Sequence, residues 1–188
     1  MDIFAHALWT SAGARGVNES FLKKHRVSVA WTAFWGIFPD LFAFSFGFIQ
    51  LFFYLILGKI TLAAIETDHH IVPGFSSAHT LYQYSHSLVI WAAVFLVVWI
   101  VRKRPHYALL GWALHILIDI PSHAATFYPT PFLFPLSDYK FLNGISWSNK
   151  WYMLINYSSL LIVFGYMLIS DLRKKRAKKV AQQYLASK

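Results

Sequence analysis

The sequence predicts an all-α fold, a polytopic bundle of roughly four to five membrane helices. The first observation behind this prediction is composition: of 188 residues, 57% are hydrophobic, 19% aromatic and only 13% charged. The second is the placement of the positive charge, which gathers at the ends of apolar runs, at 23–26, 102–104 and 173–179. Such flanks are typical of the cytoplasmic ends of membrane helices, so the net charge of +9 does not indicate nucleic acid.

The N-terminal part of the chain predicts three apolar helical pieces. Residues 2–12 form a short helix, and their acidic residue without a basic flank argues against a cleaved signal peptide. Asn18 or Ser20 can cap a second helix, which continues until Pro39. A proline inside a helical pattern ends or kinks the helix near the preceding residue. Apolar residues resume at 41–57.

The middle of the chain changes from polar to apolar. Residues 66–85 are polar and rich in histidine, so we expect a loop or short irregular helices there. An apolar helix follows at 87–101. Pro105 suits the first turn of the next helix, which is expected to end before Pro121.

The C-terminal part begins with a stretch that contains four prolines, residues 128–147, which predicts a non-helical loop. The last hydrophobic helix is expected at 150–171. We expect one domain, 1–172, followed by a solvated basic tail, 173–188, on the cytoplasmic side of the cell (inner) membrane.

The segment GWALHILIDIPSH, residues 111–123, places His115, Asp119 and His123 four residues apart. Residues at this spacing lie on nearly one face of a helix, so His115 and Asp119 can bind one ion together. Whether His123 joins them depends on how Pro121 bends the chain. A polar stripe bonded to a neighbouring helix is the alternative, but ionisable groups inside membrane segments usually mark function.

Three more ionisable residues, His6, Asp40 and His86, lie in equally apolar surroundings. Each would cost several kcal/mol if buried without a partner, and a shared divalent cation would satisfy all of them. The chain has no cysteine, so only nitrogen and oxygen ligands are available. This donor set favours Zn²⁺ first and Mn²⁺ or Fe²⁺ next.

The six residues also agree in depth. At ~1.5 Å of rise per helical residue, counted from the basic flanks, all lie within a band of roughly 16–28 Å. That band is on the side opposite the positive charge, so we expect a site toward the outer leaflet. The expected metal ligands are His6, Asp40, His86, His115, Asp119 and His123.

At these residues the chain resembles the YdjM-like family of membrane-bound metal-dependent hydrolases. The resemblance is carried by FAHALWT, IFPDLF, YSHSLVI, GWALHILIDIPSH and the Pro-rich TPFLFPL, and it extends from residue 4 to about 148. The family is related to the zinc-dependent phospholipase C and nuclease fold, an α-helical protein with metal ions bound by His and Asp. The resemblance implies that His6, Asp40, His86, His115 and Asp119 are ligands, and it adds His123.

The expected function is hydrolysis of a phosphodiester or ester in a membrane lipid or lipid-linked substrate, with one to three metal ions. Asp119 would bridge two ions, and Asp40 would serve as a ligand or general base. A metal or proton transporter is the alternative class, because transporters also place His and Asp at membrane depth. A serine nucleophile is a further alternative, from Ser85, Ser87 or Ser122.

Two other groups have competing interpretations. The loop at 128–147 could cover the site, or its aromatic residues could anchor the protein at the membrane interface. Its candidate contact residues are Tyr128, Asp138, Tyr139, Asn143 and Trp147. The remaining histidines in the polar stretch, His69, His70 and His79, could be extra ligands or simply solvated.

Overall fold

The computed structural model describes residues 1–20, 26–60, 74–126 and 128–187. The helices are α1 (Ile3–Ser20), α2 (Val29–Ile56), α4 (Gly74–Ser85), α5 (Leu88–Arg102), α6 (Leu110–Ser122) and α7 (Lys150–Ala186), with a 3₁₀ turn η1 (Tyr107–Leu109) before α6. Within these ranges the only β structure is an isolated bridge between Ala124 and Asn143. The predicted all-helical class is confirmed.

Two helices, α2 and α7, are long and apolar enough to cross a membrane. A third span exists if α4 and α5, bent by 60° at their junction, form one broken span. The stretch Tyr107–Ser122 is apolar but shorter than the ~20 residues that a span needs, and α1 is not among the candidates. The described part of the chain therefore offers two or three candidate spans, fewer than the four to five expected.

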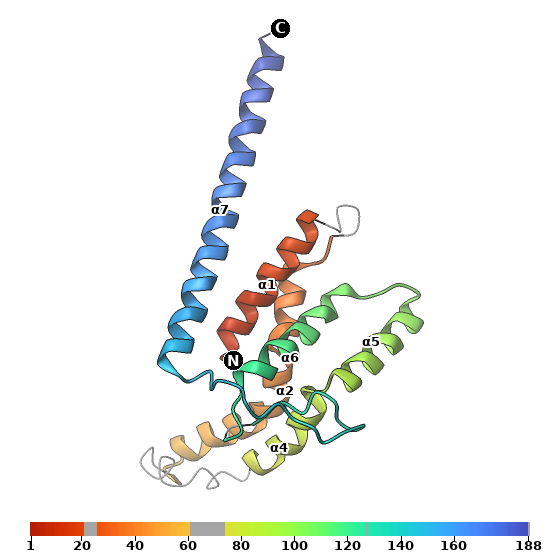
Figure 1. Cartoon of the computed structure of the whole chain (residues 1–188), viewed down its shortest axis with the longest axis vertical. Coiled ribbons are helices and arrows are strands. Elements are labelled where there is room, and N and C mark those ends of the chain that lie inside the picture. The colour runs from red at the N-terminus through yellow and green to blue at the C-terminus, as the bar shows by residue number, and fades with distance from the viewer. Residues whose placement is uncertain (21–25, 61–73, 127, 188) are drawn as a thin grey trace.

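Helix α2 differs from the prediction at its start and at its proline. Its N-cap is Ser28, whose hydroxyl accepts a hydrogen bond from the backbone N–H of Trp31 at 3.3 Å. Asn18 lies inside α1 instead, and its side-chain amide bonds both the N–H and the carbonyl of Val27. The helix then continues through Pro39 to Ile56 and bends, as Figure 1 shows. Packing against α1, α4 and α6 offsets the backbone hydrogen bond that Pro39 removes.

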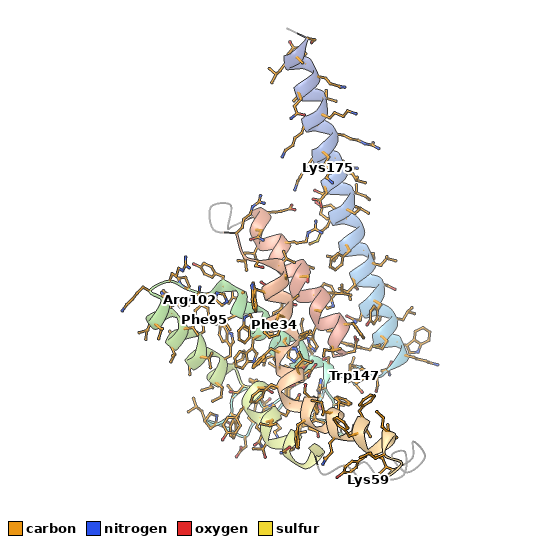
Figure 2. The ribbon with its side chains drawn as sticks, turned by 180° about the vertical axis from the view of Figure 1, so that it is seen from behind. Phe34, Lys59, Phe95, Arg102, Trp147 and Lys175 are labelled. Carbon is orange, nitrogen blue, oxygen red and sulfur yellow. The ribbon has the colours of Figure 1, made fainter. Side chains whose placement is uncertain are left out.

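Helix α7 continues fourteen residues beyond the predicted domain end, from 173 to 186. Its basic part projects past the other helices, and Lys175 lies there, at the opposite end of the molecule from Lys59 (Figures 1 and 2). Lysine, arginine, glutamine and alanine are all good helix formers, so solvation of this segment does not require loss of the helix. Two ion pairs join α7 to α1: Arg15–Asp171 at 2.7 Å and Lys174–Glu19 at 2.8 Å.

Two glycines set how closely α1, α2 and α6 approach one another. A Cβ atom on Gly111 of α6 would overlap the backbone carbonyl of Thr32 in α2. One on Gly36 of α2 would overlap the side chain of Thr10 in α1. Because His115 lies one turn after Gly111 and Asp40 one turn after Gly36, this contact holds the polar residues of the two helices together.

Between α6 and α7, the described residues 123–126 and 128–149 form no helix. The backbone of this segment is bonded to the end of α6: the N–H of Ile145 donates to the carbonyl of Pro121, and that of Trp147 to Ser122, both at 2.9 Å. It is bonded to the start of α5 as well, since the N–H of Leu88 donates to Phe132 at 3.0 Å. The segment therefore packs against the end of α6 and the start of α5, next to His86 in the break between α4 and α5.

Candidate metal centre

Four ionisable side chains from three parts of the chain meet at one point. Asp40 comes from α2, His86 from the break between α4 and α5, and His115 and Asp119 from one face of α6. Each offers one ligand atom, and these atoms all lie within 4.8 Å of one another. These four residues, the candidate metal centre, are thus close enough to hold a metal ion, as the sequence predicted.

Four separations within the centre are close to those that one small ion would require, and a fifth, from His115 Nε2 to Asp40 Oδ1, is longer at 3.8 Å. Four ligands at ~2.0–2.1 Å from a tetrahedral ion lie ~3.3 Å apart. His115 Nε2 is 3.0 Å from His86 Nε2 and 3.1 Å from Asp119 Oδ2. His86 Nε2 is 3.5 Å from Asp119 Oδ2 and also 3.5 Å from Asp40 Oδ1. The donor set therefore fits Zn²⁺ or a similar divalent cation in size and in ligand type.

Hydrogen bonds at the far side of each ring aim the ligand nitrogens inward. His115 Nδ1 donates to the backbone carbonyl of Gly36 at 2.6 Å, which leaves Nε2 as the free nitrogen. His86 Nδ1 lies 2.9 Å from the hydroxyl of Ser85, and its ring stacks on Tyr82 with centroids 3.7 Å apart. Metal-binding histidines are usually oriented by such a bond from the other ring nitrogen.

Burial differs across the centre. The side chains of His86, His115 and Asp119 are fully buried, whereas 17% of the Asp40 side chain is exposed. Asp119 Oδ2 is buried without a hydrogen-bond partner among the described residues. A buried carboxylate oxygen without a partner is costly, and a cation at this point would satisfy it. Asp40 is therefore the one residue of these four whose side chain reaches the surface of the described protein.

The other two predicted ligands contact the second oxygen of Asp119. His6 Nε2 is 3.0 Å and His123 Nε2 is 3.4 Å from Asp119 Oδ1. The amino group of Met1 also contacts this oxygen. His6 stacks on His115 with centroids 3.7 Å apart, so both rings face the same carboxylate. The structure thus gathers all six predicted residues around Asp119, and the ligand roles of His6 and His123 stay a prediction.

The environment keeps the His6 imidazole neutral. Burial, followed by the neighbouring His115 ring, lowers the pKa of His6 to about 4, although Asp119 opposes the shift. Both ring nitrogens are buried, and neither makes a hydrogen bond to another described residue. A neutral ring with a free nitrogen is the form in which histidine binds metals.

The structure places the remaining candidates outside the centre. His79 is exposed, while His69 and His70 lie outside the described residues. Tyr128 of the Pro-rich segment contributes its backbone carbonyl, which accepts hydrogen bonds from His123 Nδ1 and from the hydroxyl of Tyr82, both at 2.9 Å. Loop coverage of the site by the other residues named for it stays a prediction.

Two features of the centre were not predicted. Tyr82 stacks on His86, and the carbonyl of Gly36 orients His115. Tyr82 precedes His86 by four residues, and this spacing could have identified it as a neighbour on the same helical face. The role of the Gly36 carbonyl cannot be predicted from residue type, because every residue has a backbone carbonyl. No family model, curated protein or solved structure matches this chain.

Proposed function

We propose that this protein is a membrane-bound, metal-dependent hydrolase of a phosphodiester or ester in a membrane lipid or lipid-linked molecule. One observation carries the proposal: a buried carboxylate, Asp119, faces histidine nitrogens with both of its oxygens, and Asp40 completes the set on the exposed side. The arrangement lies among apolar helices, two of which are candidate spans. A lipid is therefore the nearest available substrate.

The residues around Asp119 suit two ions. Asp40, His86, His115 and Asp119 Oδ2 would hold the first, preferably Zn²⁺, with Mn²⁺ or Fe²⁺ as alternatives. His6, His123 and Asp119 Oδ1 would hold a second ion. A bound divalent ion lowers the pKa of coordinated water and polarises a carbonyl or phosphoryl oxygen.

The side chains have distinct roles in this proposal. The Gly36 carbonyl and the Tyr82 ring orient His115 and His86. The buried faces of His86, His115 and Asp119 exclude bulk water from the rear of the centre. The partly exposed Asp40 carboxylate would serve either as a ligand or as the general base that accepts a proton from water.

All three serine alternatives already make hydrogen bonds, and the Ser85 hydroxyl lies 2.9 Å from His86 Nδ1. The Ser87 hydroxyl caps α5 by accepting from the N–H groups of Val89 and Ile90, and it donates to the carbonyl of Phe134. The Ser122 hydroxyl donates to Asp119 Oδ1 at 3.3 Å. Both hydroxyls therefore support the structure around the centre, and a metal-dependent route is favoured over a serine nucleophile.

The proposal includes a multi-pass topology in the cell (inner) membrane, with four to five membrane segments and the basic end of α7 in the cytoplasm. It rests on the positive charge of residues 173–179. Ser187→Cys introduces a single thiol into a chain without cysteine. Labelling of intact cells by a membrane-impermeant maleimide should fail and should succeed after lysis; labelling of intact cells would reverse the orientation.

The activity is tested on the purified full chain with a panel of phospholipids and a water-soluble phosphodiester. Turnover should be abolished by a strong chelator, restored by Zn²⁺ or Mn²⁺, and unaffected by fluorophosphonates. Chelator-insensitive turnover with covalent fluorophosphonate labelling would assign a serine mechanism. Ion flux in proteoliposomes without hydrolysis of any panel member would assign the transporter class.

A further inference from the structure

An apolar groove of about 740 Å³ lies beside the metal centre, between α1, α6 and α7. Its lining includes Trp9 from α1, Leu117 and Ile118 from α6, and Ile155 and Asn156 from α7. Leu117 and Ile155 are 52% and 66% exposed, so the groove opens at the protein surface. Its volume falls within the ~300–1,000 Å³ that small-molecule sites occupy.

The side-chain amide of Asn156 lies buried in the groove, and its NH₂ group makes no hydrogen bond to another described residue. Asn156 is 7% exposed, and its Oδ1 accepts a hydrogen bond from Trp9 Nε1 at 2.8 Å. That bond fixes the orientation of the amide, because the oxygen must face the indole. The Nδ2 amino group is buried and makes no hydrogen bond to another described residue. Such a donor costs free energy unless a ligand supplies an acceptor.

The groove extends from the exposed apolar face of α7 to the neighbourhood of Asp119. On its outer side it is continuous with the exposed apolar face of α7, a helix long and apolar enough to cross a membrane. On its inner side are Met1, Pro121 and Tyr152. The amino group of Met1 contacts Asp119, so the groove ends next to the carboxylate at the middle of the six predicted ligands.

We propose that this groove binds an acyl chain of a membrane glycerophospholipid, with the ester carbonyl accepting a hydrogen bond from Asn156 Nδ2. The apolar walls suit the hydrocarbon, the opening beside α7 admits it from the bilayer, and the buried Asn156 donor suits the ester acceptor near the head of the chain. The inference rests on the proposed function only in that the lipid held here would be the substrate of the adjacent centre.

Binding can be measured without hydrolysis. The purified full chain, in nanodiscs of phosphatidylethanolamine and phosphatidylglycerol, is irradiated with a diacyl phospholipid that carries a diazirine in one chain. Mass spectrometry should place crosslinks on Leu117, Ile118 and Ile155. Ile155→Trp fills the groove and should lower these crosslinks about fivefold or more. Leu154→Trp is the matched control at the same depth, since Leu154 is 57% exposed but does not line the groove.

The role of Asn156 is tested by competition. An unlabelled diacyl phospholipid should compete about threefold to tenfold better than its dialkyl-ether analogue, because the ether lacks the carbonyl acceptor. Asn156→Leu should abolish this preference. Trp9→Phe, which removes the other hydrogen bond of the amide but keeps the Nδ2 donor, should retain it.

The outcomes separate this inference from the hydrolase proposal. Crosslinks spread equally over α7, with no difference between Ile155→Trp and Leu154→Trp, would overturn the groove assignment. Crosslinks between two copies of the chain at these residues would overturn it in favour of a dimer contact. Metal content and turnover of the water-soluble phosphodiester do not depend on the groove, so their loss or retention reports on the hydrolase proposal alone.

Discussion

Helices α6 and α7 are both apolar, yet α6 is largely buried and α7 is largely exposed. Seven of the 13 residues of α6 are buried, including His115 and Asp119. Of the 37 residues of α7, only Asn156 and Leu160 are buried. Apolar residues in α6 pack against α2 and α5, whereas those in α7 face outward, where a bilayer would cover them.

The difference shows that hydrophobicity alone does not tell which helix holds the chemistry. In α6 the small residue Gly111 brings the backbone against α2, and the ionisable residues face that contact. In α7 a Cβ on Gly165 would meet no atom within 4 Å, and the charged residues lie at its far end. Function is expected to respond strongly to changes in α6 and weakly to changes in most of α7.

The largest effect is expected from the carboxylate of α6. Asp119→Asn keeps the size of the side chain but removes the negative charge. His6, His86, His115 and His123 all face that charge. Hydrolysis should fall about 100-fold or more, as is typical for loss of one electrostatic element of a site. Initial rates with the water-soluble phosphodiester measure this.

The matched control is a carboxylate on α7. Asp171→Asn removes the partner of Arg15, a partly exposed pair, and the rate should stay within about twofold of the wild type. Equal losses in both variants would remove the distinction between the two helices.

The next effect concerns packing. Gly111→Ala forces a methyl group against the Thr32 carbonyl and should lower the free energy of unfolding by ~1–3 kcal/mol. Gly165→Ala, in open space on α7, should change it by less than ~1 kcal/mol and in the stabilising direction. Thermal unfolding of both variants in the same detergent compares them. A Gly111→Ala protein as stable as Gly165→Ala would show that α2 and α6 do not touch there.

A smaller effect is expected at the start of α7. The side chain of Asn149 accepts hydrogen bonds from the N–H groups of Trp151 and Tyr152 at 2.9 and 3.3 Å. Asn149→Ala removes this cap and should cost about 1 kcal/mol of stability, whereas Asn149→Asp should retain most of it. Chemical unfolding followed by circular dichroism distinguishes the two. Equal losses would mean that the cap does not stabilise α7.

The smallest effect is expected where α7 leaves the other helices. Lys174 and Glu19 form an ion pair whose side chains are 55% and 48% exposed. Lys174→Gln should change stability by about 0–1 kcal/mol, and the difference should disappear at high salt. A larger, salt-independent change would show that this part of α7 packs more tightly than its exposure indicates.

The sequence predicted the site better than the helix boundaries. The spacing of His115 and Asp119 is enough to place them on one helical face, and apolar surroundings identify Asp40 and His86 as partners. The structure brings these four within metal-binding distance. The spacing along one helix and the cost of burying a charge determine which residues cluster, so this clustering can be predicted from the sequence.

The predictions of helix boundaries were wrong where contacts between residues far apart in the sequence determine the structure. Pro39 was expected to end or kink the helix; α2 continues through Pro39, packed against three other helices, and bends (Figure 1). Asn18 or Ser20 was expected to cap the helix, but the N-cap is Ser28. The carbonyl of Gly36 bonds His115, and the side-chain oxygen of Asn156 bonds Trp9, in each case a residue far along the chain.

The most direct measurement is the metal content of the purified full chain, determined by inductively coupled plasma mass spectrometry after growth with Zn²⁺ and Mn²⁺. The wild type should retain at least one divalent ion per chain, and the His115→Ala, Asp119→Ala double variant should lose it while Asp171→Asn keeps it. Equal metal content in the wild type and the double variant, or none in either, would contradict a metal centre at these residues.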